Sequence, residues 1–134
     1  MSVNQLDSLR RVPIFSSLDD RALEQIAAVA TEFEAQAGQI LIEIGQPGSG
    51  LFVIEEGTVR VELPGGDRIE RGPGQFFGEL SVLSDTPRTA RVAAATDLRG
   101  LAIRRGDMNS LLDRQPAIAV AMLHEMAQRL ANAT

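Results

Sequence analysis

The residue types best suited to chemistry gather in one short segment, residues 77–90. Gly78 lets the backbone approach a ligand closely, and residues 80–83 are long enough for one helical turn before residues 84–87 turn the chain. The first N–H groups of such a turn have no partner inside it, and they attract anions. The segment therefore predicts an anion-binding site.

Two charged residues frame this segment. Arg88 follows Pro87, and its planar guanidinium can hold a phosphodiester through two hydrogen bonds, with the Thr89 hydroxyl as a further donor. Glu79 only accepts hydrogen bonds when ionised, and a ribose 2'-hydroxyl would supply the donor. The alternative is a surface ion pair between Glu79 and Arg88 worth less than about 1 kcal/mol. The residue types alone leave both interpretations open.

Composition narrows the classes of function. The 134 residues suit one domain with its own core, and 44% hydrophobic against 23% charged residues is typical of a folded globular protein. A net charge of -5 argues against nucleic acid or an anionic membrane as a direct partner of this domain. Residues 1–20 lack the apolar stretch of a signal peptide, and no run approaches the ~20 apolar residues of a membrane span. We expect a cytoplasmic protein.

Catalytic and metal sites lack their usual residues. There is no cysteine and His124 is the only histidine, which argues against a catalytic triad, a zinc site or a histidine-rich metal site. The glycine-rich residues 45–50 invite comparison with the phosphate loop of ATPases, but the chain has no lysine, which that loop requires. We predict no catalytic residue, no metal and no cofactor, and a strand connection at residues 45–50.

The spacing of apolar residues divides the chain into three parts. The first part predicts a short and a longer helix, with Ser17 as the N-cap of the second and two acidic residues in its first turn. Residues 32–103 alternate between apolar and polar with frequent turn signals, which predicts seven or eight short strands in an antiparallel sandwich or barrel. The continuous apolar run 51–54 predicts a strand that is covered on both faces.

The last part returns to helical spacing and predicts two helices. The final helix carries a broad apolar stripe of Met122, Leu123, Met126, Ala127 and Leu130. Such a stripe packs against the barrel or against the same helix of a second copy, and we expect some of each.

Residues 77–80, Phe-Gly-Glu-Leu, and residues 87–90, Pro-Arg-Thr-Ala, resemble the phosphate-binding cassette of the cyclic nucleotide-binding domain family. The flanks agree, with glycines at 38 and 45, residues 51–57, and Gly-Pro-Gly-Gln-Phe at 72–76. The closing helices also resemble the family, including the bacterial cAMP receptor proteins. The resemblance covers nearly the whole chain.

This resemblance implies a mainly β fold, an eight-stranded antiparallel jelly-roll barrel with N-terminal helices and two C-terminal helices. We expect one cyclic nucleotide-binding domain over residues 1–134. Its N-terminal helices would occupy residues 1–30, the β-roll residues 31–104 with the cassette at 77–90, and the C-terminal helices residues 106–134.

The resemblance also implies roles for individual residues. Glu79 and the Gly78 amide would bind the ribose 2'-hydroxyl, Arg88 the cyclic phosphate, and backbone amides near two further residues its oxygens. Thr89 could reach the phosphate or a syn guanine, which leaves cGMP open. Val61 and Ile69 would line the base side. The ligand-binding residues implied in this way are Gly78, Glu79, Leu80, Ser81, Arg88, Thr89, Ala90 and Val61.

The function implied is a regulatory module, not an enzyme, that senses a cyclic nucleotide and relays binding through its C-terminal helix. The resemblance ranks cAMP first among the ligands and cGMP second. Its partners would be this small molecule and either a second copy, through the C-terminal helix, or an effector protein, with no nucleic acid or membrane. The alternative is the sensor part of a longer transcription regulator, channel or enzyme. The final helix ends close to where relatives contact the base, so that contact is not assigned.

Overall fold

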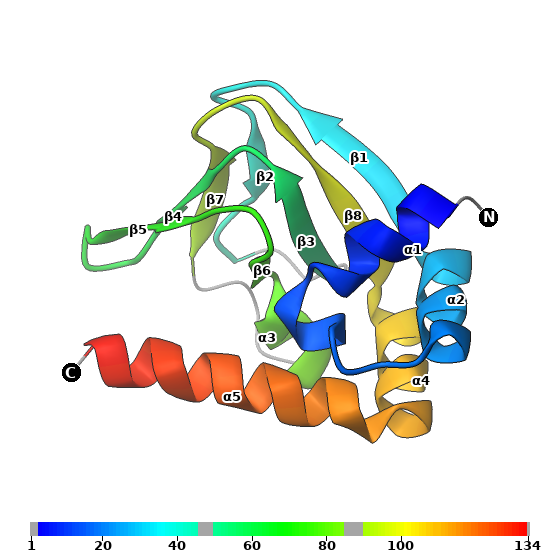
Figure 1. Ribbon diagram of the computed structural model, residues 1–134. Helices are drawn as coiled ribbons and strands as arrows, with labels where there is room; N and C mark the ends of the chain where they lie inside the picture. The colour runs from blue at the N-terminus through cyan, green and yellow to red at the C-terminus, as the bar shows by residue number, and fades with distance from the viewer. Residues whose placement is uncertain (1–2, 46–49, 85–89, 134) are drawn as a thin grey trace.

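The computed structural model describes residues 3–45, 50–84 and 90–133. Helices lie at the two ends of the chain, and strands with one short helix among them occupy its middle (Figure 1). The helices are α1 (Val3–Arg10), the 3-10 helix η1 (Pro13–Phe15), α2 (Asp20–Val29), α3 (Glu79–Leu83), α4 (Arg105–Arg114) and α5 (Pro116–Ala133). The strands are β1 (Thr31–Ala35), β2 (Ile40–Ile42), β3 (Gly50–Glu56), β4 (Val59–Glu62), β5 (Arg68–Arg71), β6 (Phe76–Phe77), β7 (Arg91–Ala94) and β8 (Leu98–Arg104).

The strands form two four-stranded sheets whose neighbours all pair antiparallel. One sheet has the order β1-β8-β3-β6 and the other the order β2-β7-β4-β5. In the β4–β5 hairpin, Val61 lies opposite Ile69 and Val59 opposite Arg71. The predicted eight-stranded antiparallel roll with flanking helices is confirmed.

Strand β3 joins the two hydrophobic cores of the protein. Leu51 and Val53 belong to the core between its sheet and the helices, whereas Ile54 belongs to the core inside the roll, with Phe52 packed against it. Successive side chains of a strand point to opposite faces, so an apolar run such as residues 51–54 can serve both cores. The prediction that this strand is covered on both faces is confirmed.

The start of α2 corrects one prediction. Ser17 is not the N-cap: the cap is Asp19, whose carboxylate accepts a hydrogen bond from the Ala22 amide at 2.9 Å. Serine and aspartate are both good caps, and the cap is whichever of them directly precedes the first helical residue. Here η1 is followed by a turn in which the Leu18 amide donates to the Phe15 carbonyl at 3.1 Å, which delays the helix by two residues.

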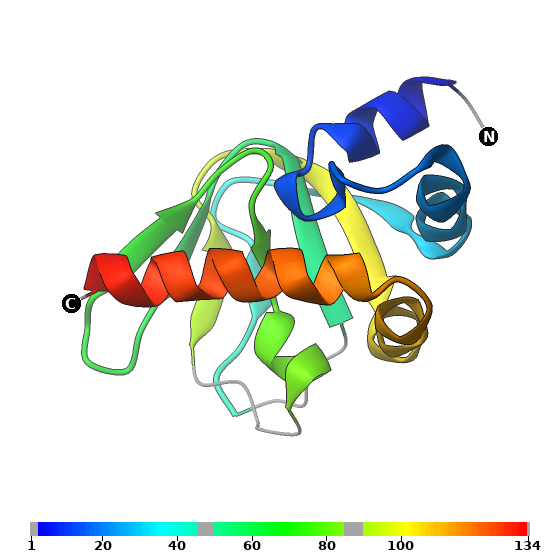
Figure 2. The ribbon, with the colours of Figure 1, turned by 60° about the horizontal axis from the view of Figure 1, so that its bottom comes forward.

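The last helix divides its apolar stripe between two surroundings. Met122 is buried and Met126 packs against the core beneath the helices, whereas Leu123 and Leu130 are 63% and 69% exposed. α5 passes α3 and reaches the β4–β5 hairpin (Figures 1 and 2). This path brings the C-terminal half of α5 to the segment that the sequence singles out for chemistry.

Candidate ligand-binding site

The turn from β6 into α3 forms one end of the candidate site. Phe76 and Phe77 are buried in β6, and Gly78 follows with a φ of 87°. Side chains are strained at such a positive φ, so glycine permits the abrupt change from strand to helix at this point. Glu79 is the first residue of α3 and is placed directly after this turn.

A cavity of about 180 Å³ opens in front of this turn. Its apolar wall comes from the roll, where Val61 and Ile69 face each other across the β4–β5 hairpin. The ring of Phe77 stacks on Phe52 at 4.9 Å between centroids, which fixes the cavity floor against the core of the roll. The lining residues are Ile42, Val61, Leu63, Ile69, Arg71, Phe77, Gly78, Glu79, Ala90, Val92 and Arg129.

The predicted site residues fall into three groups. Gly78, Glu79, Ala90 and Val61 line the cavity together. Leu80 and Ser81 lie in the first turn of α3, next in sequence to Glu79. Arg88 and Thr89 lie outside the described residues, so their predicted roles stay predictions.

Arg129 of α5 makes the principal contact with this site. Its Nη1 donates to Glu79 Oε1 at 3.0 Å, its Nη2 donates to the Phe76 carbonyl at 2.7 Å, and its Nε donates to Glu125 Oε1 at 3.3 Å. The guanidinium also lies over the Phe76 ring, 4.4 Å from the centroid. Arg129 and Glu79 are only 16% and 17% exposed, so water weakens this pair less than a surface ion pair.

Sequence reasoning assigned no role to Arg129 or to Arg71, although both line the cavity. Arg129 is separated from Glu79 by 50 residues, so no local spacing indicates their contact. Arg71 had a local signal, because it alternates in phase with the apolar Ile69 and should face the same side of the hairpin. Burial, and then the charge of Arg129, lowers the pKa of Arg71 below its usual value.

A second hollow of about 470 Å³ adjoins the first between the β4–β5 hairpin and α5. It shares Leu63, Ile69, Arg71 and Arg129 with the first cavity. Its other lining residues are polar: Asp67, Gln75, Glu125, Gln128 and Asn132. The site therefore consists of a mainly apolar cavity and a mainly polar hollow, and the two arginines Arg71 and Arg129 lie where they meet.

Known families provide an independent comparison. The sequence profile described as the cyclic nucleotide-binding domain matches residues 32–115, which is more than half of the chain. The chain belongs to the cyclic nucleotide-binding domain family. The resemblance seen in the cassette and its flanks is thereby confirmed.

Relatives of this cyclic nucleotide-binding domain occur in several kinds of protein. A cyclic nucleotide-gated potassium channel of Mesorhizobium japonicum is 37% identical over 81% of this chain and 30% of the channel. A CRP-like cAMP-activated global transcriptional regulator of Mycobacterium tuberculosis is 28% identical over 91% of this chain and 57% of the regulator. The chain thus spans about a third to just over half of the length of these curated relatives.

A solved structure agrees with both the sheets and the flanking helices. The N-terminal domain of a transcriptional regulator from Streptomyces coelicolor A3(2) is 35% identical, with a TM-score of 0.70. The match covers 96% of this chain and 95% of that one. The domain fold is therefore found as a separate structural unit in a relative.

Residues 3–45, 50–84 and 90–133 contain no group of three His, Cys, Asp or Glu side chains that could hold a metal ion. None of the helices in those residues is long and apolar enough to cross a membrane.

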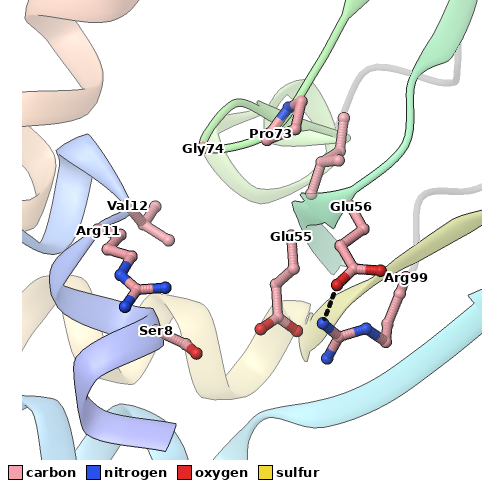
Figure 3. Close-up of a pocket in the computed structure, with 9 residues that line it drawn as sticks. Ser8, Arg11, Val12, Glu55, Glu56, Pro73, Gly74 and Arg99 are labelled. Atoms are coloured by element: carbon pink, nitrogen blue, oxygen red, sulfur yellow. Dashed lines mark hydrogen bonds and ion pairs between the residues drawn. The ribbon is translucent and has the colours of Figure 1, made fainter. Parts of the chain in front are cut away.

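A separate cavity of about 260 Å³ lies between the turn after α1 and the end of β3. Figure 3 shows the Glu55 carboxylate between Arg11 and the Glu56–Arg99 ion pair, whose Arg99 Nη2 to Glu56 Oε1 distance is 2.6 Å. Glu55 Oε1 is buried and accepts no hydrogen bond from the residues that the structure describes. The cavity is lined by two carboxylates, Glu55 and Glu56, and by two arginines, Arg11 and Arg99.

The buried Glu55 oxygen gives a stability prediction. A buried carboxylate oxygen without a donor costs more free energy than a neutral amide oxygen in the same place, so Glu55→Gln should raise the free energy of unfolding by about 1 kcal/mol. Urea denaturation followed by circular dichroism measures the change.

The neighbouring residue provides the matched control. Glu56→Gln breaks an exposed ion pair and should lower the free energy of unfolding by up to about 1 kcal/mol. Any loss of stability in Glu55→Gln would mean that the Glu55 carboxylate has a stabilising partner, and would contradict the prediction.

Proposed function

We propose that this domain is a sensor that binds a 3',5'-cyclic nucleotide in the cavity in front of α3. The observation that carries the proposal is that Gly78, Glu79 and Ala90 of the cassette meet Val61 around one cavity. cAMP is the first ligand to test, because a relative is named as activated by cAMP, and cGMP is the second.

In the proposed complex each part of the cassette has one task. Glu79 and the Gly78 amide bind the ribose 2'-hydroxyl, and Arg88 holds the cyclic phosphate with Thr89 beside it. The backbone amides near Ser81 and Ala90 complete the anion site. Leu80 lies in the chain between Glu79, which binds the ribose, and Ser81. The apolar side chain of Val61 packs against the base.

The proposed output is a shift of α5. Glu79 is engaged by Arg129, so a ribose hydroxyl that donates to the same carboxylate changes the surroundings of the arginine. The same guanidinium also donates to the Phe76 carbonyl. A change in its contact with Glu79 would therefore be transmitted to α5 through the planar guanidinium of Arg129. The ligand shifts the equilibrium between two positions of α5 only to the extent that its affinity differs between the two states of the domain.

We also propose that the domain forms a dimer through α5. Val120, Leu123, Ala127 and Leu130 follow each other at the three- and four-residue spacing of a coiled-coil seam, and all are exposed. A second copy of the same helix matches this stripe in length and spacing. An effector protein is the other occupant that would satisfy it.

The domain is proposed to act in the cytoplasm, as a binding module without catalytic activity, over residues 1–134 as one unit. The second candidate is the sensor part of a longer protein, which is favoured by the observation that the channel relative is only 30% covered. The coding sequence on either side of these residues distinguishes the two.

Ligand binding is tested by calorimetry and thermal shift with cAMP and cGMP. At about 100 times its dissociation constant the ligand should add about 2.7 kcal/mol of stability. Arg88→Ala should weaken binding by about 2–5 kcal/mol, because it removes the charged partner of the phosphate. Arg91→Ala is the control: Arg91 pairs with Glu43 at 2.8 Å outside the cavity and should leave the affinity unchanged. Binding by neither nucleotide, or normal binding by Arg88→Ala, rules the proposal out.

The relay is tested by hydrogen exchange of α5 with and without saturating ligand. Arg129→Met keeps an unbranched side chain over Phe76 but removes the guanidinium. The hydrogen bond lost to a charged group is worth roughly 1.5–3 kcal/mol. The change that ligand causes in the exchange rates of α5 should therefore fall by more than half. Arg114→Met, on the exposed side of α4, should leave the effect intact. An equal ligand effect in Arg129→Met and the unaltered chain would exclude a relay through this contact.

The dimer is tested by light scattering coupled to gel filtration. Leu123→Glu places a charge in the exposed seam and should convert the dimer to a monomer, since like charges would face each other across the interface. Gln128→Glu adds the same charge at an exposed position further round the helix from the seam and should leave the dimer intact. A monomer for the unaltered chain at all concentrations would disprove self-association.

A further inference from the structure

The cavity of about 260 Å³ at the end of β3 is separate from the cavity in front of α3, and the two have no described lining residue in common. Three parts of the chain meet there: the end of α1 with the turn after it, the end of β3, and the turn before β6 (Figure 3). The Gly74 amide donates to the Ile54 carbonyl at 2.8 Å, which ties the last two together. Pockets for drug-sized ligands measure roughly 300–1,000 Å³, so this cavity suits a smaller molecule.

Glu55 is placed in this cavity by an irregularity of β3. Ile54 pairs with Gly100, and Glu56 pairs with Arg99, so Glu55 is an extra residue with no counterpart on β8. Such a β-bulge re-aims a side chain and is common beside functional sites. Figure 3 shows the Glu55 carboxylate directed into the cavity.

One carboxylate oxygen of Glu55 is an unused acceptor. Oε1 is buried and has no donor among the described residues, although the side chain as a whole is half-buried and lines the cavity. Arg99 donates to Glu56 instead; this bond chiefly raises the pKa of Arg99, and Glu55 adds to that only through its charge. Buried polar atoms in folded proteins are nearly always hydrogen-bonded, so the unused oxygen points to a donor from outside the chain.

Arg11 lies on the other side of Glu55 from the Glu56–Arg99 pair (Figure 3). The described residues provide no hydrogen-bond or ion-pair partner for its guanidinium. The two carboxylates and two arginines of the cavity balance each other in charge. A ligand with only an ammonium group would be repelled by Arg11, and one with only a carboxylate would be repelled by Glu55. A small molecule that carries both groups avoids each repulsion.

We propose that this cavity is a second ligand site, for a small zwitterion with a primary ammonium group and a carboxylate, such as a free amino acid. The ammonium donates to Glu55 Oε1, and the carboxylate accepts from the Arg11 guanidinium. The aliphatic part of the ligand packs against Val12 and Pro73, which line the same cavity. The inference is independent of the proposed function, because no residue of the cassette takes part.

A binding role also explains why a carboxylate occupies a position where it costs stability. Glu55→Gln is expected to stabilise the empty domain, yet it removes the negative charge that an ammonium group requires. Substitutions that raise stability and lose function are typical of binding sites. The same variant should therefore be more stable and bind less, a combination that a purely structural glutamate would not produce.

The test is a titration of the isotope-labelled 134-residue chain followed by amide NMR spectra. The probes are L-alanine, β-alanine and γ-aminobutyrate, whose two charged groups are progressively further apart. At least one should bind with a dissociation constant of about 1 mM or below. It should shift the amides of Ser8, Arg11 and Gly74, and not those of Gly78 and Glu79 at the cavity in front of α3. Butylamine and butyrate each lack one charged group and should bind roughly tenfold more weakly or worse.

Glu55→Gln and Arg11→Gln should each weaken binding of the tightest probe by roughly tenfold or more, the loss expected for a hydrogen bond between charged groups. Glu24→Gln and Arg21→Gln are the matched controls, because these exposed residues of α2 lie outside the cavity and should leave the affinity unchanged. Thermal melting of each variant verifies that it is folded.

Three results overturn the inference. The first is the absence of shifts at the cavity amides with all three amino acids at about ten times the expected dissociation constant. The second is normal binding by Glu55→Gln or by Arg11→Gln. The third is butylamine or butyrate binding as tightly as the amino acids, which would indicate a site for one sign of charge only.

Discussion

The contact between Arg129 and Glu79 is the one on which the arrangement of the site depends. It joins the last helix to the first residue of α3, and the same guanidinium holds the Phe76 carbonyl of the preceding strand. Both charged groups are largely removed from water, so separating them without a replacement partner is costly. Any ligand that engages Glu79 must therefore either share this carboxylate with the arginine or displace it.

The roll supplies the rigid half of this arrangement. β3 contributes to both cores, and the stacked rings of Phe52 and Phe77 tie the cavity floor to the interior. Buried Met122 anchors α5 in the core beneath the helices, whereas Arg129 further along the helix reaches the site through polar contacts with Glu79 and Phe76. Rigid walls with an adjustable cover suit a module whose shape responds to what it binds.

The roll was predictable from the sequence because its signals are local. Alternation of apolar residues, glycine-rich turns and the continuous apolar run in β3 led to the right fold class. The cassette motif singled out Gly78 and Glu79, and both line the cavity in front of α3. The Ser17 cap was wrong because two residues of similar capping ability stand close together, and the turn after η1 decides between them. Arg129 could not be paired with Glu79 from spacing, since that contact depends on how α5 crosses the roll. Arg71 was open to prediction as an inward residue, but its lowered pKa depends on burial and on Arg129, which other elements supply.

One helix carries both the buried arginine of the site and the exposed stripe of Leu123, Ala127 and Leu130. A rigid helix cannot shift one face without the other, so site occupancy and self-association would share a single coupling free energy. That coupling is reciprocal: whatever factor the ligand exerts on pairing, pairing exerts on ligand affinity. The concentration of nucleotide at which such a sensor responds would then depend on the concentration of the sensor itself.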